Sequence, residues 1–231
     1  MKRFYKEVSI VEAEDGWRVL LDGRAIKTVG GRPQVVPSEA LARALAEEWA
    51  GQGEEIDLTA FRYRDLVDYA LDVIAADRQE AVTALVPYAE TDTLCYRADP
   101  DEPLFPRQQE LWEPILTSFE TRHGLRFERV SGIIHRAQPD ATLTALRARL
   151  EAAEPFTLAA LRNLASLAAS LVIALAALED QAEVEKLWAA ACLEEEWQAD
   201  LWGRDWEAEE RREKRAAAFA GAVEFVRLAK G

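Results

Sequence analysis

The scarcity of helix breakers in the last 90 residues constrains this chain more than any other feature. Residues 142–231 contain one proline and three glycines, the residue types that interrupt a helix most strongly. Four runs have the composition and hydrophobic spacing of helices: 142–152, 156–178, 181–202 and 205–228. We therefore predict a helical bundle over residues 139–231.

One segment of this bundle, residues 164–178, is apolar on nearly every side. Such a helix is expected to be enclosed by others, and its alanines and serines allow neighbouring backbones to approach closely. Its 15 residues are fewer than the roughly 20 that cross a bilayer. We predict a central buried helix and no membrane insertion.

The first 37 residues follow a strand-like pattern instead. Two runs suited to strands, 17–21 and 25–28, flank an Asp22-Gly23 pair. An Asp-Gly pair between such runs favours a hairpin turn, because glycine accepts a positive φ without steric cost. We predict a β-rich N-terminal unit over residues 1–37. Segments up to about residue 135 would enlarge this unit if they also form strands.

The pattern becomes helical after this unit. Ser38 is expected to cap a helix that ends near Gly51, and Pro87 to end a shorter helix. Residues 104–123 indicate a further helix, whereas residues 90–97 are compatible with an extended piece or with a helix start capped by Asp92 or Thr93. The predicted fold class is α+β, with a mainly helical domain over residues 38–231.

The charge of the chain limits its partners. It has 28 basic and 42 acidic side chains, a formal net charge of −14. Binding to a phosphate backbone depends on clustered lysine and arginine. Nucleic acid is therefore excluded as a partner.

The sequence lacks the usual signals for a metal or a nucleotide. Cys95 and Cys192 are far apart, and His123 and His135 have no second ligand at metal-binding spacing. Neither GxGxxG nor GxxxxGK[ST] is present. We expect no metal, no cofactor and no small-molecule substrate.

An enzyme is the alternative from another class of function. Cys95 lies two residues from Arg97, a cation that would favour a thiolate nucleophile, and the carboxylates form several close groups. With 42 carboxylates such groups arise by chance, and no base or oxyanion motif accompanies the cysteine. We expect Cys95 to be a small buried residue and the chain to have no catalytic residues.

The run 181–202 contains the best candidate for a binding site. In a continuous helix, one stripe carries Trp188, Cys192, Glu195, Gln198 and Trp202. A lone carboxylate on this largely apolar stripe requires an internal cation or a cationic partner.

The pairs Glu207–Arg211 and Glu210–Lys214 on the next helix are typical of a solvated face, with direct partner contact as the alternative.

Seven motifs in the same order resemble a known family. They are 4–10 (FYKEVSI), 21–24 (LDGR) with Lys27-Thr28, 36–41 (VPSEAL), 47–49 (EEW), 92–97 (DTLCYR), 109–114 (QELWEP) and 193–198 (LEEEWQ) followed by Trp202-Gly203. The chain resembles the assembly chaperones specific for the alpha subunit of F-type ATP synthase. The resemblance covers nearly the full length.

The resemblance implies a chaperone without catalysis or cofactor, whose client is the unassembled alpha subunit. The important acidic position of the family matches Glu195, with Glu194 as the next choice; Gln198, Trp202 and Trp188 complete the implied client-binding group. Mitochondrial members carry a transit peptide before the Phe-Tyr motif, whereas only three residues precede it here. A bacterial cytoplasmic chaperone is therefore expected, and a stable regulatory subunit of a complex is the remaining alternative.

Overall fold

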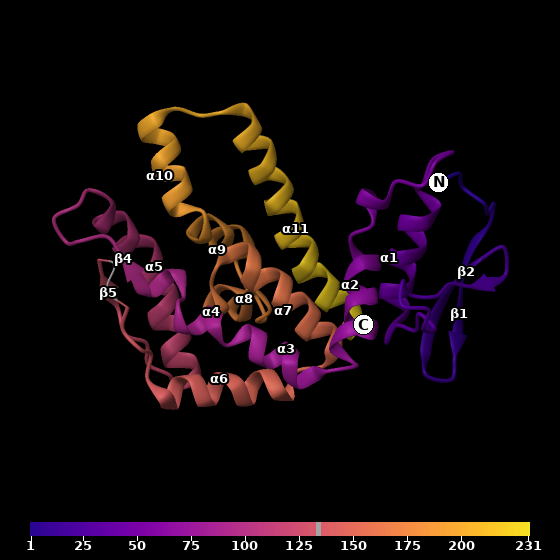
Figure 1. Cartoon of the computed structure of the whole chain (residues 1–231), viewed down its shortest axis with the longest axis horizontal. Coiled ribbons are helices and arrows are strands. Elements are labelled where there is room, and N and C mark those ends of the chain that lie inside the picture. The colour runs from indigo at the N-terminus through magenta and orange to yellow at the C-terminus, as the bar shows by residue number, and fades with distance from the viewer. Residues whose placement is uncertain (133–134) are drawn as a thin grey trace. The chain divides into compact units, whose positions relative to one another are not determined.

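The computed structural model describes residues 1–132 and 135–231. Contacts divide the chain into two compact units. Unit 1 consists of Met1–Arg78, Glu154–Ala160 and Gly221–Gly231, and unit 2 of Gln79–Ala153 and Leu161–Ala220. Short N-terminal strands precede a mostly helical remainder (Figure 1), which confirms the predicted α+β class.

Unit 1 contains a small antiparallel sheet in the order β1-β2-β3. Its elements are β1 (Val8–Ala13), β2 (Gly16–Leu21), β3 (Arg24–Ala25), α1 (Glu39–Ala50), the 3-10 turn η1 (Leu58–Ala60), α2 (Tyr63–Tyr69) and the π-helical turn η2 (Ala70–Ile74). The predicted turn between β2 and β3 is confirmed. Asp22 and Gly23 have φ of 47° and 75°, as a two-residue type I′ turn requires.

The turn between β1 and β2 was missed in the sequence. It precedes Gly16, whose φ is 139°. A Cβ on Gly16 would lie 2.4 Å from the Val36 carbonyl oxygen, so no side chain fits at this position. The position therefore requires glycine. The turn residues are Glu14 and Asp15, since Ala13 pairs with Gly16, so the Asp15-Gly16 pair indicates the turn one residue too late.

Helix α1 begins and ends where the sequence predicts. The Ser38 hydroxyl accepts a hydrogen bond from the Leu41 amide at 3.1 Å, and Gly51 follows the last turn. The Glu48 carboxylate of α1 in turn accepts from the first amides of α2, those of residues 62–64, at 2.8–3.0 Å. The capping group of α2 therefore comes from another helix.

Chain segments far apart in sequence complete the core of unit 1. Phe225 lies near two other aromatic rings, with centroids 6.4 Å from Tyr63 and 6.1 Å from Phe156. The Ser38 hydroxyl donates to the Leu228 carbonyl. Residues 154–160 and 221–231 are therefore part of the same packed core as the sheet and α1.

The remaining elements form a bundle with a two-stranded parallel ladder, β4 with β5. They are α3 (Arg78–Leu85), α4 (Pro87–Glu90), the 3-10 turn η3 (Thr93–Cys95), β4 (Tyr96–Arg97), α5 (Leu104–His123), β5 (Val130–Ser131), α6 (Asp140–Ala152), α7 (Pro155–Ala168), α8 (Leu171–Ala177), α9 (Val184–Ala191), α10 (Leu193–Trp202) and α11 (Trp206–Lys230). Residues of α7 and α11 belong to both units. No helix of the described residues is long and apolar enough to cross a membrane.

Two predicted helices are each broken in two. The run 156–178 breaks after α7, where Ala169 has φ of 48° and Ser170 caps α8. The freed Ala169 carbonyl accepts from the amide and hydroxyl of Thr93 at 3.1 and 2.9 Å. The run 181–202 breaks at Cys192, which separates α9 from α10. Segment 164–178 is nevertheless largely buried, as predicted.

Candidate functional site

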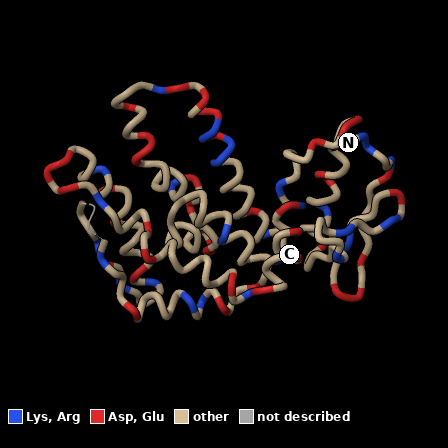
Figure 2. The backbone as a smooth tube through the Cα atoms, viewed as in Figure 1, with Lys and Arg blue, Asp and Glu red and all other residues tan. Residues whose placement is uncertain are grey.

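The acidic start of α10 lies against a basic stretch of α11. Glu195 Oε2 accepts from Arg215 Nη1 at 2.8 Å. Glu196 Oε1 pairs with Arg212, which also lies 3.9 Å from Glu195 Oε1. Figure 2 shows acidic residues along α10 and basic residues along this part of α11. The two helices are therefore joined by ion pairs through two successive glutamates.

Glu195 has the internal cation that was one of the two alternatives, while a cationic partner stays a prediction. Its side chain is nevertheless 40% exposed. Ion pairs in water contribute about 0–1 kcal/mol, so the carboxylate can also interact with a partner without a large loss of stability. Arg215 is fixed further by the ring of Trp188, whose centroid lies 5.4 Å from the guanidinium carbon.

The predicted stripe is not continuous. The backbone at Cys192 leaves the helical path, so residues before and after it do not share one helix face. Trp188 is half-buried against Phe219, with ring centroids 5.2 Å apart, whereas Gln198 and Trp202 are exposed. The structure therefore brings Trp188, Glu195 and Arg215 together and leaves Gln198 and Trp202 farther along α10.

Glu194 has a different environment from Glu195. Its Oε1 accepts from Nε2 of Gln108 at 2.8 Å, and the Oε1 of this fully buried glutamine accepts from the Ala98 amide at 2.8 Å. Although the residue as a whole is exposed, burial around its carboxylate raises the pKa of Glu194, and the hydrogen bond from Gln108 opposes that rise. Glu194 thus connects α10 to α5, while Glu195 and Glu196 connect it to α11.

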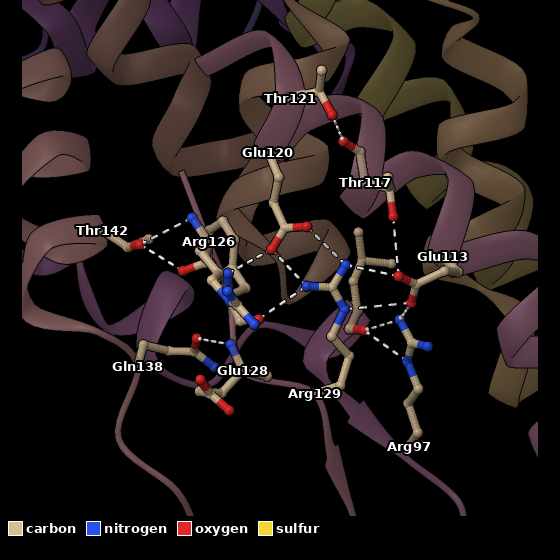
Figure 3. A network of polar contacts seen from close by, with 12 residues as sticks. Arg97, Glu113, Thr117, Glu120, Thr121, Arg126, Glu128, Arg129, Gln138 and Thr142 are labelled. Atoms are coloured by element: carbon tan, nitrogen blue, oxygen red, sulfur yellow. Dashed lines mark hydrogen bonds and ion pairs between the residues drawn. The ribbon is translucent and has the colours of Figure 1, made fainter. Parts of the chain in front are cut away.

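A network of arginines and glutamates fixes α5, which carries Gln108 (Figure 3). Arg97 is buried and lies 2.7 Å from Glu113, and Arg129 bridges Glu113 and Glu120 at 2.8 and 2.5 Å. Burial would raise the pKa of Glu113, but hydrogen bonds from Arg129, Arg97 and Thr117 outweigh it and lower the pKa to about 2. Glu113 is held as an anion by its two arginines, and the ion pairs of this network suit a scaffold.

Three residues of this region were missed or misassigned in the sequence. Gln108 has no recognisable signal, because its role depends on burial beside Glu194. Arg212 and Arg215 lie three apart on α11 and so share a face, a signal that the interpretation as a solvated helix overlooked. The predicted pairs Glu207–Arg211 and Glu210–Lys214 are present at 3.7 and 2.7 Å.

Cys95 is fully buried, and burial raises the pKa of its thiol. A nucleophilic cysteine requires the opposite shift.

We expect Cys95→Ser to lower the free energy of unfolding by about 1–2 kcal/mol, because the hydroxyl would be buried without a full set of partners. Thermal melts beside Cys95→Ala measure this loss. A folded Cys95→Ser protein that had lost its function would contradict the structural role.

The described residues contain no group of three or more histidine, cysteine, aspartate or glutamate side chains placed to hold a metal ion. The carboxylates of α5 and α10 instead pair with arginine or accept from glutamine. This region offers a half-exposed acidic surface on helices that are joined by ion pairs. Such a surface is suited to binding a protein with basic side chains.

Comparisons with known proteins identify the family. The sequence model described as ATP12 chaperone protein matches residues 2–120, about half of the chain. The mitochondrial atp12 protein of Schizosaccharomyces pombe is 27% identical over 218 residues, which cover 87% of this chain and 74% of that protein.

Solved structures agree over almost the whole length. The crystal structure of Atp12 from Paracoccus denitrificans is 36% identical, with a TM-score of 0.92 and coverage of 99% of this chain and 98% of that one. The Atu1473 protein of Agrobacterium tumefaciens is 38% identical, with a TM-score of 0.92 and coverage of 98% and 85%. The chain therefore belongs to the ATP12 family of assembly chaperones and is not an enzyme.

Proposed function

We propose that this protein binds the unassembled alpha subunit of F-type ATP synthase, shields the surface that later contacts beta, and promotes assembly of the catalytic head. The observation that carries the proposal is membership of the ATP12 chaperone family along nearly the full chain. The seven motifs shared with alpha-specific assembly chaperones support the choice of client. The compartment that we propose is the bacterial cytoplasm, with the mitochondrial matrix for eukaryotic relatives.

The physical need for such a protein follows from the client. A free alpha subunit exposes apolar surface that beta covers in the assembled enzyme, and exposed apolar surface of that size promotes aggregation. A chaperone that binds this surface stabilises the free subunit by mass action. Holding the free subunit in this way requires no ATP.

Co-expression tests the client. The protein is expressed with the alpha and beta subunits from the same genome and recovered by an affinity tag. We expect alpha to be recovered with it in the absence of ATP and beta not to be. Recovery of beta alone, or a requirement for ATP hydrolysis, would contradict the proposal. Presence of the protein in purified, finished ATP synthase would favour a stable regulatory subunit instead.

Charge reversal tests the acidic surface. We expect Glu195→Lys to reduce recovery of alpha about tenfold or more, because like charges at an interface oppose binding. The melting temperature should change little, since the pairs of Glu195 are half-exposed. Glu194→Lys should instead destabilise the fold by about 1–3 kcal/mol, because Gln108 loses its acceptor.

Glu12→Lys is the matched control, since Glu12 is an exposed carboxylate on β1 in unit 1. It makes the same change in net charge and should leave recovery of alpha unchanged. Equal losses of binding in Glu195→Lys and Glu12→Lys would assign the effect to net charge and contradict a role for the α10 surface.

A further inference from the structure

The connection between α10 and α11 exposes three large hydrophobic side chains. Leu201, Trp202 and Trp206 are 61%, 86% and 72% exposed. Within the described part of unit 2, all large hydrophobic side chains that are exposed belong to this six-residue segment, because the others lie in unit 1. We call these three residues the apolar tip. Tryptophan is among the residues that most often dominate the energy of a protein interface.

The apolar tip is held in place by an ion-pair cluster. Arg204, in the middle of the connection, binds carboxylates of both helices: Glu196 at 2.9 Å, Asp200 at 3.0 Å and Glu209 at 3.1 Å. The backbone reverses at Gly203, whose φ is 98°. These pairs restrict the connection that carries the tip, and a surface that is ordered before binding loses less conformational entropy on association.

The surroundings of the tip determine the chemistry of that partner. Residues 193–215 contain nine carboxylates and five lysine or arginine side chains, a net charge of −4, and each of these five cations pairs with a carboxylate of the same stretch. This acidic setting disfavours anionic lipid surfaces and nucleic acid. It also disfavours a second copy of the chain, which would place like charges opposite each other. A protein surface with an apolar centre and a rim of lysine and arginine is complementary to it.

We propose that the apolar tip inserts into such a surface on the unassembled alpha subunit, as a second contact beside Glu195. The inference rests on the proposed function, which supplies the client. The tip is continuous with the candidate site, which supports this proposal. Glu196 pairs both with Arg212 of the candidate site and with Arg204 of the α10–α11 connection. The tip supplies the apolar contact, and the carboxylates of α10 supply orientation and rate of association.

The test uses the full-length double variant Trp202→Ala/Trp206→Ala. Because both rings are exposed, its melting temperature should match that of the wild type. We expect its affinity for purified alpha subunit, measured by surface-immobilised binding, to fall by about 30-fold or more, the loss typical of interface residues that dominate binding. Phe4→Ala is the control, since Phe4 is also largely exposed but belongs to unit 1.

The outcomes separate the two proposals. If wild-type protein does not bind alpha, the proposed function fails; if it binds and the double variant binds equally well, only the inference about the tip fails. Two further measurements address other occupants. The wild type is tested for binding to phosphatidylglycerol vesicles and for dimers in sedimentation. The inference would be overturned if the double variant lost either of these properties but kept its affinity for alpha.

Discussion

Asp92→Ala is expected to lower the free energy of unfolding by about 2–6 kcal/mol. Asp92 is fully buried, and its two carboxylate oxygens accept from the Leu94 amide at 3.1 Å and the Val172 amide at 3.0 Å. Alanine would leave both donors buried without a partner, at about 1–3 kcal/mol each. Chemical denaturation measures the loss, which affects η3 and α8 together.

Asp92→Asn is the matched variant, and its difference from wild type should depend on pH. Burial raises the pKa of Asp92 to about 6 from the ordinary value of 3.8, although hydrogen bonds from Val172, Ser170 and Leu94 oppose the rise. Between these two values the folded state holds the proton more tightly than the unfolded state. The contribution of Asp92 to stability therefore increases as pH falls from 6 to 4.

Denaturation of both proteins across this range isolates Asp92 from the other carboxylates. The wild type should gain stability relative to Asp92→Asn as the pH is lowered. A constant difference between the two proteins would mean that Asp92 titrates alike in the folded and unfolded states, contrary to its burial.

Trp112→Ala is expected to have the second large effect. It should lower the free energy of unfolding by about 3–5 kcal/mol, because it leaves a cavity in the core. Trp112 on α5 is fully buried, and its Nε1 donates to the Ala190 carbonyl of α9 at 2.8 Å. Denaturation of Trp112→Phe gives the comparison. Phenylalanine retains most of the packing and removes the hydrogen bond, so it should cost about 1–3 kcal/mol. Equal losses in both variants would assign the effect to the hydrogen bond and contradict the packing argument.

Elements with local start and stop signals could be predicted from the sequence. Helix α1 lies between Ser38 and Gly51, the β2–β3 turn uses Asp22-Gly23, and α5 spans the predicted residues 104–123. Each of these signals acts within a few residues. The alternatives for residues 90–97 were both partly correct, since Asp92 caps η3 and β4 follows it.

The two helix breaks were not predicted, and at the first of them distant groups add to the local cap that Ser170 gives α8. Neither Ala169 nor Cys192 is a typical helix breaker. At the first break, Thr93 binds the Ala169 carbonyl and Asp92 binds the Val172 amide, about 80 residues away in the chain. A pattern that assumes a continuous helix beyond such a point assigns faces wrongly, as it did for Trp188 relative to Trp202.

The candidate site was predictable only in part. Glu195 was identified because a carboxylate interrupted an apolar stripe, and the structure provides the expected cation in Arg215. The identity of that cation depends on how α11 packs on α10. Leu201 and Trp206 were not identified, since no sequence pattern distinguishes an exposed hydrophobic side chain from a buried one.

The composition of unit 1 has a consequence for synthesis. The buried Phe225 and Val226 complete its core, yet residues 79–153 and 161–220 are translated between its first segment and these residues. Domains usually fold in order as they leave the ribosome. Here the core of unit 1 cannot be completed until all of unit 2 has been made. The nascent chain therefore exposes an incomplete core for most of its synthesis, and the unit that starts first finishes last.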